Sequence, residues 1–198
     1  MKLDVWEAIS SILEAGGKFQ NEMYEIRNND GLLHREGGPA VIYPNGKQEW
    51  YQNGLSHRYD GPAVIYPDGR QYWYWNGELH RNDGSAVICP DGEQYWYWNG
   101  QLHREDGPAI VDADGSHHWY RNDKLHRDDG PAIVHPNGEQ HWYRNDEPHR
   151  DDGPAVYLAD GTQFWYRDGM YHRDDGPAII YPDGTQKWYL NGNLQSEK

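Results

Sequence analysis

The chain has 198 residues, of which 36% are hydrophobic, and a formal net charge of −14 at pH 7. This acidity argues against a nucleic-acid backbone or an anionic membrane surface as a partner, because long-range repulsion opposes both. A single cysteine, Cys89, excludes an intramolecular disulfide framework and a cysteine-rich zinc site, while 10 Trp and 16 Tyr against 2 Phe indicate that amphipathic aromatic side chains supply the burial.

The N-terminal segment is expected to cap the rest of the chain. Apolar residues within 1–17 fall on one stripe and are followed by two glycines, which predicts a short capping α-helix; the alternative is a helix that docks elsewhere. Residues 18–37 predict a degenerate capping hairpin, with a strand over Phe19–Ile26 and a turn at Asn29-Asp30-Gly31. Because the acidic N-terminus is unlike a signal peptide, we expect a cytoplasmic protein, of a bacterium or of a virus-infected host cell.

Residues 38–198 consist of seven repeats of 23 residues, with no insertion between them. A Trp-Tyr pair marks each repeat at the same step. The seven tryptophans are Trp50, Trp73, Trp96, Trp119, Trp142, Trp165 and Trp188. Such strict spacing indicates that each repeat stacks on the previous one with the same geometry.

The repeat at residues 61–83 shows the expected local structure. A β-branched run, Ala63–Tyr66, ends at a Pro-Asp-Gly turn, and an aromatic run, Gln71–Trp75, ends at an Asn-Gly turn. We expect one strand from each run and a connector over Leu79–Gly84. Because two short strands are unstable alone, the sequence predicts an all-β fold, an elongated single-sheet array of seven 23-residue β-hairpin repeats with about fourteen strands and a short N-terminal capping helix.

A 23-residue hairpin with an Asp-Gly turn, an aromatic strand, an Asn-Gly turn and a following His resembles the membrane occupation and recognition nexus (MORN) repeat. The likeness is to the divergent arrays of bacterial, phage and giant-virus proteins, and it covers roughly residues 19–198. The resemblance implies stacked hairpins and a non-catalytic scaffold, of which some variants act as antitoxin or immunity components.

A His-Arg pair recurs at the same 23-residue step and is followed by an acidic residue. A catalytic site is normally needed once, so we interpret the pairs as a hydrogen-bonded structural ladder between neighbouring connectors, with repeated anion or metal sites and catalysis as the alternatives. No catalytic motif is found elsewhere, and we expect neither enzymatic activity nor a cofactor. The ladder residues are His57, Arg58, His80, Arg81, His103, Arg104, His126, Arg127, His149, Arg150, His172 and Arg173.

Other positions change from repeat to repeat and are the candidates for binding. Trp, Tyr and Arg dominate the hot spots of protein interfaces. The candidate partner-binding residues are Tyr72, Trp75, Tyr95, Trp98, His118, Arg121, His141 and Arg144. The alternatives are packing variants, a slot for a nucleotide or sugar, and a metal site. His117, His118, His135 and His141 are numerous enough to suggest a transition-metal site, but His117 and His118 point to opposite faces of a strand, so no compact set of three ligands is evident and we expect no metal.

Two turns depart from the repeat pattern. Asn122-Asp123 and Asn145-Asp146 replace the Asn-Gly turn in the fourth and fifth repeats. Asp is strained at positive φ, so we expect these turns to have another conformation or a partner.

These features predict a non-catalytic repeat protein that binds a protein partner, from a host or a toxin, and inhibits it by occlusion. Binding would use a broad aromatic and His/Arg-rich sheet face. The alternatives are a module that sequesters a nucleotide or sugar, and a homo-oligomeric scaffold that self-associates through sheet edges or the aromatic face.

Overall fold

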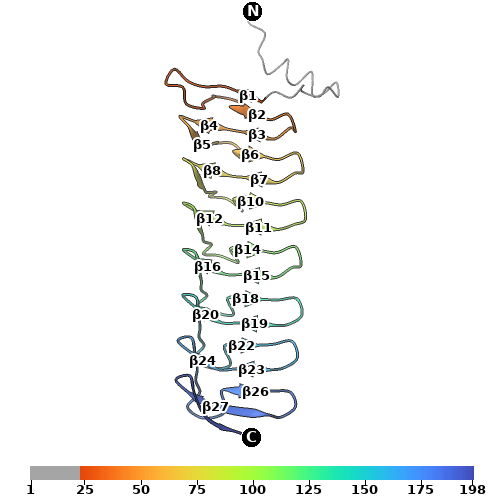
Figure 1. The fold of residues 1–198 in the computed structure, drawn as a ribbon, viewed down its shortest axis with the longest axis vertical. Helices are drawn as coiled ribbons and strands as arrows, with labels where there is room; N and C mark the ends of the chain where they lie inside the picture. The colour runs from red at the N-terminus through yellow and green to blue at the C-terminus, as the bar shows by residue number, and fades with distance from the viewer. Residues whose placement is uncertain (1–22) are drawn as a thin grey trace, which may run out of the picture. The chain divides into compact units, whose positions relative to one another are not determined.

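The computed structural model describes residues 23–198, which form a succession of short antiparallel hairpins (Figure 1). The predicted all-β fold of repeated hairpins is confirmed for these residues. They contain no helix, and therefore none long and apolar enough to cross a membrane. The helix expected over residues 1–17 and most of the strand expected over Phe19–Ile26 lie outside the described residues. The chain divides into two units, Met1–Pro90 and Asp91–Lys198.

In the first unit, each hairpin pairs with the next in one antiparallel ladder. Its strands, in spatial order, are β1 (Tyr24–Glu25), β2 (Val41–Ile42), β3 (Gln48–Glu49), β6 (Val64–Ile65), β7 (Gln71–Tyr72) and β10 (Val87–Ile88). Two separate side hairpins lie outside this ladder, β4 (Tyr51–Gln52) with β5 (Leu55–Ser56) and β8 (Tyr74–Trp75) with β9 (Glu78–Leu79).

The second unit repeats this plan. Its ladder contains β11 (Gln94–Tyr95), β14 (Ile110–Val111), β15 (His117–His118), β18 (Ile133–Val134), β19 (Gln140–His141), β22 (Val156–Tyr157), β23 (Gln163–Phe164), β26 (Ile179–Ile180), β27 (Gln186–Leu190) and β28 (Asn193–Glu197). Its side hairpins are β12 (Tyr97–Trp98) with β13 (Gln101–Leu102), β16 (Tyr120–Arg121) with β17 (Lys124–Leu125), β20 (Tyr143–Arg144) with β21 (Glu147–Pro148), and β24 (Tyr166–Arg167) with β25 (Met170–Tyr171).

The aromatic run of a repeat does not form the single strand that the sequence predicts. In the repeat at residues 61–83, the run divides at Trp73. Gln71–Tyr72 joins the ladder as β7, whereas Tyr74–Trp75 pairs with Glu78–Leu79 in a side hairpin. The prediction of two strands per repeat is therefore wrong: the repeats before the last have four strands, because each aromatic run contributes to two different pairings, and the last repeat has three.

The backbone at the dividing Trp remains fully hydrogen-bonded. The Trp73 N–H donates to the Ala86 carbonyl of the next repeat at 2.7 Å, and the Trp73 carbonyl accepts from the His80 N–H at 3.1 Å. The Ala at this position of each repeat is fully buried, with 0% exposure, at Ala40, Ala63, Ala86, Ala109, Ala132, Ala155 and Ala178. The core thus consists of small and β-branched side chains where successive strands meet, and a larger residue has no room at the Ala position.

Both turns of the repeat have the backbone conformation that their residues favour. Gly69 of the Pro-Asp-Gly turn has φ +95°. Asn76 and Gly77 have φ 49° and 86°, the positive values that a tight Asn-Gly hairpin turn requires. The side hairpin is therefore fixed locally, which positions the residue before the turn, Trp75, at the surface.

Candidate functional site

Each connector holds an Arg guanidinium between a Trp ring and a Gly. The Arg127 Cζ lies 4.1 Å from the Trp119 ring centroid, and a Cβ placed on Gly130 would lie 3.0 Å from the same atom. Arg127 Nε donates to Asp129 at 2.8 Å and Nη1 donates to the Pro131 carbonyl at 3.3 Å. The hydrogen bond from Arg127 lowers the pKa of Asp129. The His-Arg-x-Asp-Gly-Pro sequence is thereby explained as one packed cluster.

The same stacking recurs along the chain. It joins Arg58 to Trp50, Arg81 to Trp73, Arg104 to Trp96, Arg127 to Trp119, Arg150 to Trp142 and Arg173 to Trp165, with distances of 4.1–4.2 Å. A guanidinium over an indole gains cation–π attraction in addition to its hydrogen bonds. The arginine side chains that the sequence assigns to a ladder therefore contact the Trp of their own repeat and the residues that directly follow them, while the backbone N–H of Arg127 donates to the Tyr143 carbonyl of the next repeat at 3.4 Å.

The histidines of the same pairs bond the next repeat instead. His57 Nδ1 lies 2.9 Å from Asn76 Oδ1 and accepts from the Asn76 N–H at 3.1 Å. Equivalent contacts join His103 to Asn122, His126 to Asn145, His149 to Asp168 and His172 to Asn191. His80 Nε2 contacts Asn82 Oδ1 at 2.8 Å. The contacts through His Nδ1 therefore join a connector to the side-hairpin turn of the following repeat rather than to the following connector.

The two irregular turns are explained by the fold. Asp123 and Asp146 keep the positive φ of the Asn-Gly turn, at 64° and 71°. Their carboxylates accept from the backbone N–H groups of Leu102 and Leu125, in each case at 2.8 Å. The conformation is unchanged and the partner is the previous repeat, so these turns do not mark a binding site.

Arg121 and Arg144, two of the candidate binding residues, form ion pairs with acidic residues of the connectors that follow their side hairpins. Arg121 Nη2 lies 2.8 Å from Asp128, whose other carboxylate oxygen lies 2.9 Å from His126 Nε2. Hydrogen bonds from Arg121 and then His126 lower the pKa of Asp128. Arg144 pairs with Asp151 at 3.0 Å in the same way. The surface expected to be cationic is therefore balanced by carboxylates, which weakens it as a phosphate site.

Tyr59 and Trp75 form an exposed aromatic pair over a buried histidine. Tyr59 is 70% exposed and Trp75 is 42% exposed, and their ring centroids lie 5.0 Å apart. Both centroids lie 4.5 Å from that of His57, which is 3% exposed. Within the described residues, His57 Nε2 has no hydrogen-bond partner.

Tyr59 was not among the residues that the sequence singles out, although the repeat gives a signal. In four other connectors, the residue at this position bonds to the His Nε2: Asn82 with His80, Asp128 with His126, Asp151 with His149 and Asp174 with His172. Tyr59 is the only aromatic residue at this position of the connectors. Its ring covers His57 without replacing the acceptor, so this repeat gives up a hydrogen bond that others make.

The remaining candidates divide between the ladder and the side hairpins. Tyr72, Tyr95, His118 and His141 lie in ladder strands β7, β11, β15 and β19 and are half-buried. His118 Nε2 lies 2.7 Å from Asp112. Trp75 and Trp98 lie in side hairpins and are 42% and 49% exposed. The eight candidate partner-binding residues thus belong to two sets of strands, the ladder strands and the side hairpins, rather than to one.

Open grooves separate successive connectors. In the second unit, grooves of about 570 and 650 Å³ are lined by charge-paired Arg and Asp residues and by Trp119 and Trp142, respectively. In the first unit, a groove of about 480 Å³ is lined by residues that include Trp50, His57 and Tyr59. The first-unit groove is therefore bordered by one member of the exposed aromatic pair.

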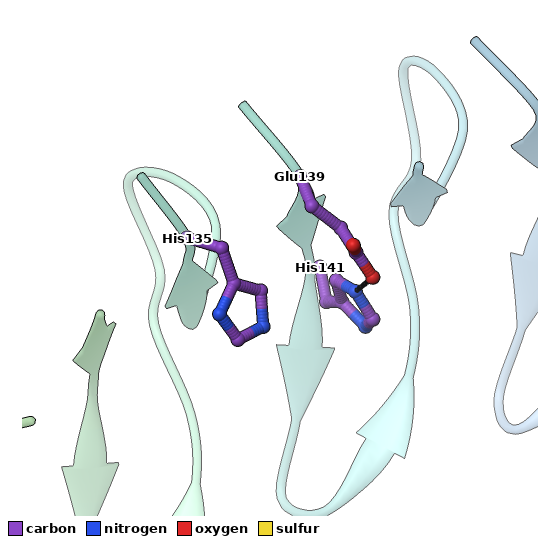
Figure 2. A group of neighbouring side chains, drawn as sticks. All are labelled: His135, Glu139 and His141. Atoms are coloured by element: carbon purple, nitrogen blue, oxygen red, sulfur yellow. Dashed lines mark hydrogen bonds and ion pairs between the residues drawn. The ribbon is translucent and has the colours of Figure 1, made fainter. Parts of the chain in front are cut away.

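From the sequence, His135 and His141 were candidate metal ligands, but Glu139 and the compact cluster that the three residues form were missed. The structure brings His135 and Glu139 beside His141, which the sequence assigns to partner binding (Figure 2). His135 precedes the Pro136-Asn137-Gly138 turn and Glu139 follows it, so the hairpin that the turn closes places both near β19. This hairpin geometry was the available signal. Hydrogen bonding from His141 lowers the pKa of Glu139.

Comparison with known protein families found no match, and comparison with curated protein sequences found none either.

Proposed function

We propose that the chain is a non-catalytic repeat protein that binds a basic protein partner through Tyr59 and Trp75 and occludes the partner's functional surface. The observation that supports this proposal is the exposed aromatic pair over His57, whose Nε2 lacks a hydrogen-bond partner within the described residues. The MORN-like resemblance and the cytoplasmic location that the sequence predicts are part of the same proposal.

Tyr59 leaves His57 Nε2 without a hydrogen-bond acceptor, so its presence is better explained by binding than by folding. A buried nitrogen without a partner costs about 1–3 kcal/mol. Asn at position 59 would supply an acceptor, as Asn82 does in the next repeat. Trp and Tyr are the residue types that contribute most to protein interfaces when a partner covers them. Tyr59 thus gives up a hydrogen bond to His57 for an accessible aromatic surface that it forms with Trp75.

The charge of the chain favours a basic partner. Its net charge is −14, and Asp60, directly after Tyr59, has a side chain that is 82% exposed while it pairs with Arg58 at 2.8 Å. Glu36 lines the groove beside Tyr59. Carboxylates around an aromatic anchor steer a positively charged protein toward it and reject an acidic one.

The test compares variants that copy residues of neighbouring repeats and so preserve the fold. Tyr59→Asn takes the residue at 82, and Trp75→Gln takes the residue at 52. Tyr157→Val, which takes the residue at 134 and removes an exposed Tyr of the second unit, is the control. Proteins captured from a lysate of the source cells are identified by mass spectrometry, purified and titrated by calorimetry.

We expect a basic protein whose Kd rises about 30-fold with Tyr59→Asn/Trp75→Gln, as for loss of a 2 kcal/mol hot spot, and stays within about twofold for Tyr157→Val. Capture of no protein, or equal affinity of wild type and the double variant for the captured protein, would contradict the proposal.

A further inference from the structure

Three metal-ligating side chains lie together in one hairpin of the second unit (Figure 2). One ligand atom from each of His135, Glu139 and His141 lies within 4.8 Å of the others. His141 Nε2 is already 2.9 Å from Glu139 Oε1. The turn that separates His135 from Glu139 is closed by a hydrogen bond from the His135 N–H to the Glu139 carbonyl, at 2.9 Å.

The His135 ring is held in the orientation that a metal ligand needs. Its Nδ1 lies 2.9 Å from the hydroxyl of Ser116, a residue that is only 1% exposed. Its other nitrogen, Nε2, is on the side of Glu139 and His141 (Figure 2). A hydrogen bond from Nδ1–H to Ser116 leaves the Nε2 lone pair free, as outer hydrogen bonds do for metal-binding histidines.

We propose that His135, Glu139 and His141 bind one divalent transition-metal ion, of which Zn²⁺ is the representative probe. Two imidazoles and one carboxylate suit zinc and its neighbours, whereas Mg²⁺ and Ca²⁺ prefer oxygen ligands. Ligands of tetrahedral zinc lie about 3.4 Å apart, so the three atoms need to close by at most about 1.4 Å. Three protein ligands leave a fourth position for water or for a ligand from another molecule.

Packing alone does not require these three side chains. The next repeat has Leu158, Thr162 and Phe164 at the equivalent positions and forms the same strand pairs, β22 with β23. The cluster is also accessible to an ion, because the side chains of His141 and Glu139 are 19% and 25% exposed. An acidic chain attracts cations, which favours binding further.

The test uses the metal alone and is independent of any protein partner. Tag-free, metal-free protein is titrated with ZnSO₄ by calorimetry, and its melting temperature is measured with Zn²⁺ and with Mg²⁺. The triple variant His135→Leu/Glu139→Thr/His141→Phe copies the next repeat. The control His117→Gln removes an imidazole that points to the face of its strand opposite to His118, and it restores the Gln found at this position in the other repeats.

We expect the triple variant to bind one Zn²⁺ fewer than wild type and to lose the Zn²⁺-dependent rise in melting temperature, while His117→Gln retains both and Mg²⁺ has no effect. If the triple variant is not folded, Glu139→Thr alone should weaken binding at least about tenfold. The inference is overturned if wild type binds no Zn²⁺, or if removing the ligands leaves stoichiometry and affinity unchanged.

Discussion

At the scale of single residues, Arg127 shows how one side chain organises a connector. Its guanidinium stacks on Trp119, bonds Asp129 and fills the space beside Gly130. Gly130 does not have the positive φ that makes glycine necessary elsewhere, so the close approach of Arg127 is what requires it. The glycine of the motif is therefore a packing requirement rather than a turn requirement.

We expect Gly130→Ala to lower the free energy of unfolding by about 1–3 kcal/mol, because the new Cβ displaces the guanidinium. Urea denaturation measures the change. In a double-mutant cycle with Arg127→Ala, the cost of Gly130→Ala should shrink, since the displaced group is then absent. Strictly additive effects would show that the two residues are not coupled.

At the scale of the elements, the side hairpins depend on bonds between repeats. Asp123 sits at φ 64° and accepts from the Leu102 N–H. Asp123→Gly relieves the backbone strain but loses this bond, two effects of about 1 kcal/mol each that nearly cancel. Asp123→Ala keeps the strain and loses the bond, so we expect it to be about 1–2 kcal/mol less stable than Asp123→Gly in urea denaturation. Equal stability of the two variants would argue against backbone strain at position 123, and an Asp123→Gly variant clearly more stable than wild type would argue against the bond.

The elements that could be predicted are those whose signals are local. The two turns follow from Gly, Asn and Pro, and the strand Val64–Ile65 follows from β-branched residues. The division of the aromatic run at Trp73 could not be predicted, because it depends on a hydrogen bond to Ala86 in the next repeat. Residue types show strand preference but not which strand is the partner.

The candidate sites divide in the same way. Trp75 was identified because the residue at its position changes from repeat to repeat and is a Trp in only two of them. Tyr59 was not, because its significance lies in the acceptor that it fails to supply to His57. The cluster of His135 and Glu139 with His141 needed the hairpin register, which brings residues on either side of a turn together.

At the scale of the whole molecule, the 23-residue period has no insertion, and we expect it to be a strict requirement for strand pairing. Deletion of residues 141–163 joins Gln140 to Phe164, which restores the order of residues found in every repeat. We expect this variant to keep its β signal in far-UV circular dichroism and to unfold cooperatively. Deletion of residues 142–163 leaves one extra residue in the strand, and a one-residue slip turns buried side chains outward. We expect this second variant to lose cooperative unfolding, and equal behaviour of the two would contradict strict register.

The anchoring contacts of the connectors also bear on how such a chain evolves. Arg over Trp, and His on the next turn, recur in repeat after repeat, whereas Tyr59, Trp75 and the His135 cluster occur at positions that those contacts leave free. A duplicated repeat brings its own anchors with it. Copying followed by divergence can therefore supply new recognition surfaces without first inventing a new fold.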